Sequence, residues 1–166
     1  MTGVRTHDRI LDAAEQLVRE DAAGDDGTWA AAIVLTAAAC ETASSYAIAR
    51  LYELDQLRAT PRLRGPDLRE LRRLLKSKKT INLKPKRQRR IWQTLSNDKL
   101  SRWPEWIRYV RHIDDCNAIA HSGLLSGRRV AHQSDATEAL KITHAFHQHL
   151  QQVIRAHALR DTSSRL

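Results

Sequence analysis

Apolar residues recur at three- and four-residue steps along most of the chain, which is the spacing of one face of an α-helix. The clearest case is the stretch Trp103–Gly123, where an apolar stripe passes through Trp106, Tyr109 and Ile113. Gly123 at its end suits the left-handed backbone conformation that terminates many helices. We therefore expect a helix here, with one side buried and the other side open to solvent.

The same spacing predicts five further helices. They run over about Thr6–Asp21, Trp29–Gln56, Pro66–Lys76, Pro85–Leu95 and Asp135–Leu159. The first half of the second helix is apolar nearly all round, so we expect it at the centre of the fold. Gly and Pro number only 6 and 4, which leaves little material for the turns of a β-rich fold. The pattern predicts an all-α bundle of about five to six helices in one domain over residues 1–166, with a frayed tail over 160–166.

Basic residues are concentrated in one segment, residues 58–90. It holds fourteen basic and two acidic residues, a net charge of +12, whereas the rest of the chain carries −3 of the total of +9. We expect a basic helical hairpin inserted into the bundle, with RNA or DNA as the natural partner of this charge. The other interpretation is a solvated basic loop without a partner. The bases expected to contact nucleic acid are Arg69, Arg72, Arg73, Lys76, Lys78, Lys79, Lys84, Lys86, Arg87, Arg89 and Arg90.

Two residues keep alternative interpretations. Trp92 lies beside the basic run and could stack on a base, but a Trp at helical spacing is more often part of a core, which we favour. Glu41 ends the apolar run of the second helix. Its carboxylate is either paired, placed at the edge of a cavity, or simply exposed at the surface.

A polar stripe lies beside the apolar stripe of the stretch Trp103–Gly123. Asp114, Asn117 and His121 follow one another at three- and four-residue steps and so share a helix face. An imidazole has an unperturbed pKa near ~6.5 and moves protons at neutral pH, which makes His121 a candidate catalytic residue. The alternative is that His121 only caps carbonyl groups at the end of its helix.

Two segments together carry a family resemblance. The apolar helix AAIVLTAAACETASSYAIARLYE contains Glu41, and the later segment CNAIAHSG precedes a loop and one last long helix. They resemble the HEPN superfamily of helical domains, found in many prokaryotic toxins and defence proteins. The family motif is an Arg, usually followed by a polar residue such as Asn, and then a His with four to six residues between it and the Arg. Asn117 and His121 match this motif. The three positions where the Arg would stand are Asp114, Asp115 and Cys116.

The resemblance implies a metal-independent endoribonuclease, in which the ribose 2′-hydroxyl attacks its own phosphate. His121 would transfer protons, Asn117 would orient the reacting groups, and an Arg would hold the phosphate. HEPN domains commonly place two motif helices around a two-fold axis, so a second copy could supply the Arg that this motif lacks. The candidates for that Arg are Arg108, Arg111, Arg128 and Arg129.

The sequence thus predicts an HEPN-like RNA-binding protein and candidate metal-independent endoribonuclease of a toxin–antitoxin or antiviral defence system. We expect a homodimer, with RNA and an antitoxin or another defence protein as partners. Two alternatives stay open. One is a non-catalytic HEPN-like interaction module that has lost the Arg, and the other is a basic helical DNA-binding protein.

No cofactor and no metal site is predicted. His144, His147 and His149 lie on the last helix without a third ligand at a recognisable spacing. We therefore interpret them as residues of the polar side of that helix.

The chain is expected to be cytoplasmic and not membrane-bound. Cys40 and Cys116 have no metal-binding spacing, which suggests thiols in a reducing compartment. The N-terminus has charged residues where an export signal would be apolar. The apolar run Trp29–Cys40 is too short to span a bilayer.

Overall fold

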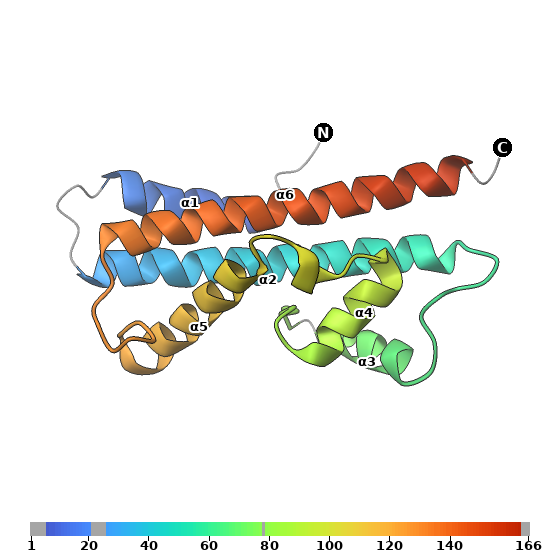
Figure 1. The fold of residues 1–166 in the computed structure, drawn as a ribbon, viewed down its shortest axis with the longest axis horizontal. Helices are drawn as coiled ribbons and strands as arrows, with labels where there is room; N and C mark the ends of the chain where they lie inside the picture. Colours follow the sequence, from blue (N-terminus) through green and yellow to red (C-terminus); the bar gives the residue numbers. More distant parts are fainter. Residues whose placement is uncertain (1–5, 21–25, 78, 164–166) are drawn as a thin grey trace. The chain divides into compact units, whose positions relative to one another are not determined.

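A computed structural model describes residues 6–20, 26–77 and 79–163, and the chain is all-helical over these ranges (Figure 1). Its elements are α1 (Thr6–Glu20), α2 (Asp26–Gln56), α3 (Gly65–Lys76), α4 (Lys86–Ser96), the short 3₁₀ helix η1 (Leu100–Arg102), α5 (Trp106–Ser122) and α6 (Gln133–Ser163). None of the described residues lies in a strand. The predictions of an all-α fold and of five to six helices are confirmed.

The last helix differs from its prediction at both ends. It begins at Gln133 rather than Asp135, and the Asp135 carboxylate accepts a hydrogen bond from the backbone N–H of His132, 2.9 Å away. Asp135 is thus the third helical residue, where an acid reaches back to the residue before the helix. At the other end α6 continues to Ser163 instead of fraying from residue 160, because no Gly or Pro stops its propagation. Residues 164–166 of the predicted tail lie outside the described ranges.

The contacts of the chain divide it into two compact units. Unit 1 is Met1–Cys40 with Pro104–Phe146, and unit 2 is Glu41–Trp103 with His147–Leu166. The long helices α2 and α6 each contribute their N-terminal half to unit 1 and their C-terminal half to unit 2. That the whole chain is one domain stays a prediction.

The core of unit 1 is built from small residues beside a few large ones. The small residues include Ala32 on α2 and Ala136 and Ala139 on α6, and they allow close packing with little side-chain volume. Around Tyr109 the packing is aromatic, since its ring stacks on that of Phe146 with centroids 4.3 Å apart. The other members of the Ala-rich cluster are Trp29, Ile33, Ile119, Leu125 and Ala131.

Helix α5 ends as its sequence predicts. Gly123 has a φ of 71°, and its N–H donates to the carbonyl of Ile119 at 2.8 Å. A residue with a Cβ is strained at this φ, so glycine stabilises the stop. The helix begins at Trp106, with Pro104 just before it.

Unit 2 contains the predicted basic hairpin, in which α3 and α4 contact one another (Figure 1). Its apolar residues form a core in which Leu71 of α3 and Ile91 and Trp92 of α4 are fully buried. The indole N–H of Trp92 donates to the Asp98 carboxylate at 2.9 Å. The prediction that Trp92 is a core residue is confirmed, and its ring is not accessible to a base.

Helix α2 is apolar over much of its length. Its portion Gly27–Gln56 is long and apolar enough to cross a membrane by length and composition, with 56% of the most apolar window buried inside the fold. A central helix of a soluble bundle has the same properties. The sequence prediction considered only Trp29–Cys40 and so did not detect it. Cys40, in the middle of α2, is fully buried, and neither it nor Cys116 forms a disulfide.

Candidate functional site

The two predicted catalytic residues lie on the exposed side of α5. Asn117 and His121 are four residues apart, so their side chains lie one helical turn from each other. Both side chains are exposed, and within the described ranges neither makes a hydrogen bond or ion pair. His121 therefore does not serve as a carbonyl cap in this structure.

Two of the four candidate replacement arginines are already occupied by acids in the same chain. Arg108 is held by Glu105 and Glu138, and Arg129 donates two hydrogen bonds to Asp135, of 2.7 and 2.6 Å. These carboxylates raise the pKa of both guanidinium groups. A phosphate would have to displace an acid at either position.

The guanidinium groups of the other two candidates are not paired with a carboxylate of the described residues. Arg111 and Arg128 are exposed, and among the described residues neither side chain has an ion-pair partner. Arg111 precedes His121 by ten residues, about 15 Å of helix rise, which is too far for both to hold one phosphate in the same copy. Asp115, one turn after Arg111 on α5, accepts hydrogen bonds from the backbone N–H and the hydroxyl of Ser126.

A different histidine of α5, His112, is the one that the fold buries. It lies nine residues before His121, and at about 100° per residue this puts the two rings on opposite faces of the helix. His112 is only 6% exposed, and its Nε2 lies 3.3 Å from the Thr36 hydroxyl of α2. Burial lowers its pKa to about 4, against a smaller opposing effect of Asp115, so the imidazole is neutral at pH 7. Sequence reasoning missed this residue, although its place among the apolar positions of α5 was a signal.

A cavity of about 400 Å³ opens beside His112 in unit 1. Its apolar wall includes Ile33 of α2 and Ile142 of α6, and charged side chains of α5 and α6 surround the rest. This volume is in the range of small-molecule sites. Neither Asn117 nor His121 lines the cavity, so it is separate from the predicted catalytic stripe.

The basic segment carries less unpaired charge than its sequence indicates. Its only acids bridge α3 to α4: Asp67 binds Arg90, and Glu70 binds Arg87 as well as Arg73. The hydrogen bonds from Arg73 lower the pKa of the Glu70 carboxyl, which burial partly opposes. Three of the eleven predicted bases are thus partly neutralised within the hairpin.

The remaining predicted bases divide by position. Arg69, Arg72 and Lys76 are exposed and lie three and four residues apart on α3, which puts them on one side of the helix; we call them the α3 basic face. Arg72 also donates a 3.4 Å hydrogen bond to the Tyr52 hydroxyl, and within the described ranges none of the three contacts an acid. Lys79 and Lys86 are exposed, Lys84 and Arg89 are half-buried, and Lys78 lies outside the described residues.

Glu41 fixes the connection between α3 and α4. Its two carboxylate oxygens accept hydrogen bonds from the Thr80 hydroxyl at 2.7 Å and from the Asn82 amide at 3.1 Å. One turn along α2, the hydroxyl of Ser45 accepts from the backbone N–H of Ile81 at 2.7 Å. Of the three interpretations of Glu41, the structure supports the paired one.

Two histidines of α6 contact other parts of the chain. His144 binds Glu15 of α1 at 2.8 Å, and His149 binds Asp98 at 2.9 Å while its ring stacks on Trp103. The interpretation of His144, His147 and His149 as polar-side residues is wrong for His147, which is 7% exposed. The reason is that its position on α6 faces the interior of the fold.

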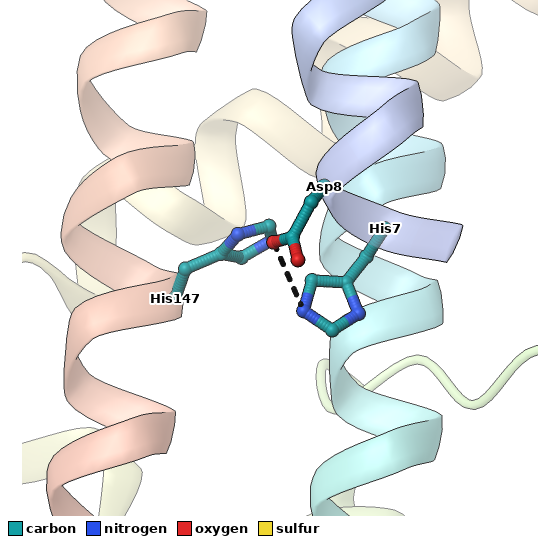
Figure 2. Close-up of side chains that lie close together, drawn as sticks. All are labelled: His7, Asp8 and His147. Carbon is teal, nitrogen blue, oxygen red and sulfur yellow. Dashed lines mark ion pairs between the residues drawn. The ribbon is translucent and has the colours of Figure 1, made fainter. Parts of the chain in front are cut away.

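At the start of α1, His7 and Asp8 are adjacent and interact. Their Nε2 and Oδ1 atoms are 3.4 Å apart, as Figure 2 shows by a dashed line. The His7 side chain is 5% exposed, whereas that of Asp8 is 42% exposed. The pair thus places a carboxylate at the surface beside a buried ring.

Comparison of the chain with protein-family models, with curated proteins and with solved structures finds no match. The resemblance to HEPN domains therefore stays a prediction.

Proposed function

We propose that the protein binds RNA through the α3 basic face, as an HEPN-like homodimer of a cytoplasmic toxin–antitoxin or antiviral defence system. The observation that carries the proposal is the use of both acids of the basic segment as bridges between α3 and α4. They leave Arg69, Arg72 and Lys76 exposed together, with no acidic partner in the part of the chain that the structure describes. Three adjacent bases of this kind are a binding surface for phosphates.

The surroundings of this face favour a fixed arrangement of the bases. The ion pairs of Asp67 with Arg90 and of Glu70 with Arg87 join the two helices of the hairpin. Glu41 attaches the connection between those helices to α2. Bases on a prearranged surface lose less conformational entropy when they bind a phosphate backbone.

The test is the salt dependence of binding to a labelled single-stranded RNA, measured by fluorescence anisotropy. The variant replaces Arg69, Arg72 and Lys76 by Gln. Each phosphate contact contributes about 0.7 to the slope of log K against log salt, so we expect the slope to fall by about 2. The control removes the same charge elsewhere, at the exposed residues Arg9, Lys141 and Arg155. Equal slopes for the two triple variants would refute the proposed surface, and tighter binding of duplex DNA than of RNA would favour the DNA-binding alternative.

A second candidate function is metal-independent RNA cleavage at His121. It is supported by the exposure of Asn117 and His121 side by side, with no intramolecular partner among the described residues. We expect wild type to cleave a mixed RNA pool in excess EDTA and His121→Ala to be inactive, whereas the exposed control His132→Ala keeps its activity. Cleavage that survives in His121→Ala would disprove the role of this residue.

Arg111 and Arg128 are the arginines that a second copy has available for that reaction. If one of them acts across the dimer, Arg111→Gln or Arg128→Gln is inactive alone. Mixing the inactive arginine variant with His121→Ala then restores about a quarter of wild-type activity, because half of the dimers are mixed and each holds one intact site. Absence of cleavage by wild type, with RNA binding retained, favours the non-catalytic interaction module.

A further inference from the structure

The polar lining of the cavity beside His112 has hydrogen-bonding capacity that contacts within the described ranges do not use. The Thr36 hydroxyl has one hydrogen, and it donates it to the carbonyl of Ile33 at 2.7 Å. Thr36 must therefore accept from His112, so the hydrogen of the neutral ring is on Nε2 and the lone pair is on Nδ1. Nδ1 makes no hydrogen bond within the described ranges, although the ring is 6% exposed and lines the cavity.

Two charged groups of α5 beside the same cavity also have capacity left. Arg111 has no acidic partner among the described residues. Within the described ranges Asp115 uses only Oδ1, which accepts both hydrogen bonds from Ser126, so its Oδ2 is available. The remaining charges of the lining are already matched, since Arg108 binds Glu138 and Asp135 binds Arg129 outside the cavity.

These three groups define the charges that a ligand of this cavity would need. The guanidinium of Arg111 suits an anion, and a carboxylate fits its planar shape. Nδ1 of His112 and Oδ2 of Asp115 both accept hydrogen bonds, and a group that donates to a neutral ring and to a carboxylate together is an ammonium. A ligand with a carboxylate alone would leave Asp115 unmatched, and an amine alone would leave Arg111 unmatched.

The rest of the lining defines the body of the ligand. Ile33, Leu125 and Ile142 form an apolar wall, on which an aliphatic or aromatic side chain would lose its exposure to water. We propose that the cavity binds a free apolar α-amino acid, with the carboxylate on Arg111, the ammonium on His112 and Asp115, and the side chain on the apolar wall.

Isothermal titration calorimetry of the full chain tests this with leucine, isoleucine, valine, methionine and phenylalanine as probes. We expect at least one of the five to bind. Two analogues of that amino acid serve as controls, one without the amine and one without the carboxylate. For leucine these are 4-methylpentanoate and 3-methylbutylamine, respectively. Each analogue loses a charged hydrogen bond and should therefore bind at least about tenfold more weakly than the amino acid. Glycine, which lacks the side chain, should bind more weakly as well. Failure of all five to bind at millimolar concentration would overturn the proposal, as would an analogue that binds as tightly as the amino acid.

Variants then assign the contacts. Arg111→Gln should weaken binding at least about tenfold, whereas Arg155→Gln, an exposed arginine of unit 2, should leave it unchanged. His112→Phe removes Nδ1 at similar volume and should also weaken binding, and His112→Asn, which returns an acceptor near that position, should recover part of it. Equal affinity of Arg111→Gln and wild type would overturn the assignment, and this surface variant tests it even if the core variants fold poorly. The α3 basic face does not line the cavity, so this proposal and the RNA-binding proposal succeed or fail separately.

Discussion

The burial of His112 predicts how the stability of the protein depends on pH. In the folded chain the pKa of His112 is lowered to about 4, chiefly because burial disfavours the charged ring. In the unfolded chain its pKa is near ~6.5. As the pH falls below the unfolded value, the unfolded state takes up a proton that the folded state does not, so the free energy of unfolding decreases.

The size of the effect follows from the difference between the two pKa values. It is about 2.5 units at about 1.4 kcal/mol each, or about 3.5 kcal/mol in total, of which about 3 kcal/mol is lost by the time the pH has fallen to about 4. Below the folded value both states are protonated and the loss is complete. A loss of this size is a large part of the stability of a typical domain.

Charged groups around His112 come from two helices. On α5 these are Asp115, whose charge raises the pKa of His112 without overcoming burial, and Arg108 and Arg111. On α6 they are Asp135 and Glu138. The hydrogen bonds from Arg129 lower the pKa of the Asp135 carboxyl, which burial partly opposes.

Urea unfolding measures this directly, with wild type and His112→Phe compared at several values between about pH 7 and about pH 4. The Phe variant keeps the volume of the ring and cannot titrate. We expect the stability difference between the two proteins to shift by about 3 kcal/mol in favour of the variant as the pH falls. Titration of the other histidines and of the carboxylates cancels in this difference. A difference that is constant with pH would show that the ring is hydrated or that it titrates near its ordinary pKa in the folded state, and the reasoning would be refuted.

Two further predictions concern contacts that position the candidate surfaces. Glu41→Ala removes the acceptor of Thr80 and Asn82 and should lower the free energy of unfolding, measured in urea, by about 1–2 kcal/mol. The control Glu53→Ala, at an exposed helix position, should change the free energy of unfolding by less than about 0.5 kcal/mol. Equal effects of the two variants would mean that the Glu41 contacts contribute little. Gly123→Ala strains a backbone at φ 71° and should cost about 1 kcal/mol by thermal or urea unfolding, although a Cβ there meets no atom within 4 Å. The same change at Gly127, which also has open space and lacks a positive φ, should be nearly neutral, and a loss as large as that of Gly123→Ala would exclude backbone strain as the cause.

Features that depend on neighbouring residues were predictable from the sequence. The spacing of apolar residues predicted that α5 is a helix, and Gly123 predicted where it ends. The core position of Trp92 followed from its helical spacing. Each of these depends on residues within a turn or two of one another. The end of α6 was less predictable, because a helix without Gly or Pro has no local stop.

The candidate sites depend on contacts between distant residues, and here the sequence was less informative. Thr36 and His112 are 76 residues apart, and the local pattern of α5 does not predict that the His112 ring donates to a hydroxyl of α2. The prediction of a catalytic site at His121 rested on a polar stripe, and an ordinary exposed helix face shows the same polar pattern. His112 was the less conspicuous residue because it lies among apolar neighbours, and that placement is the reason for its burial and its lowered pKa.

The basic segment shows why a count of charges overestimates the surface available to the proposed RNA partner. If all eleven predicted bases contacted phosphates of single-stranded RNA, the slope of log K against log salt would be about 8. Asp67 and Glu70 already engage three of the eleven, and Lys84 and Arg89 are half-buried. The surface that remains is centred on the three bases of α3, which are expected to contribute about 2 to the slope of log K against log salt. The pairing of the two acids thus reduces the strength of binding that the composition suggests, and it also determines which side of the hairpin is left to bind.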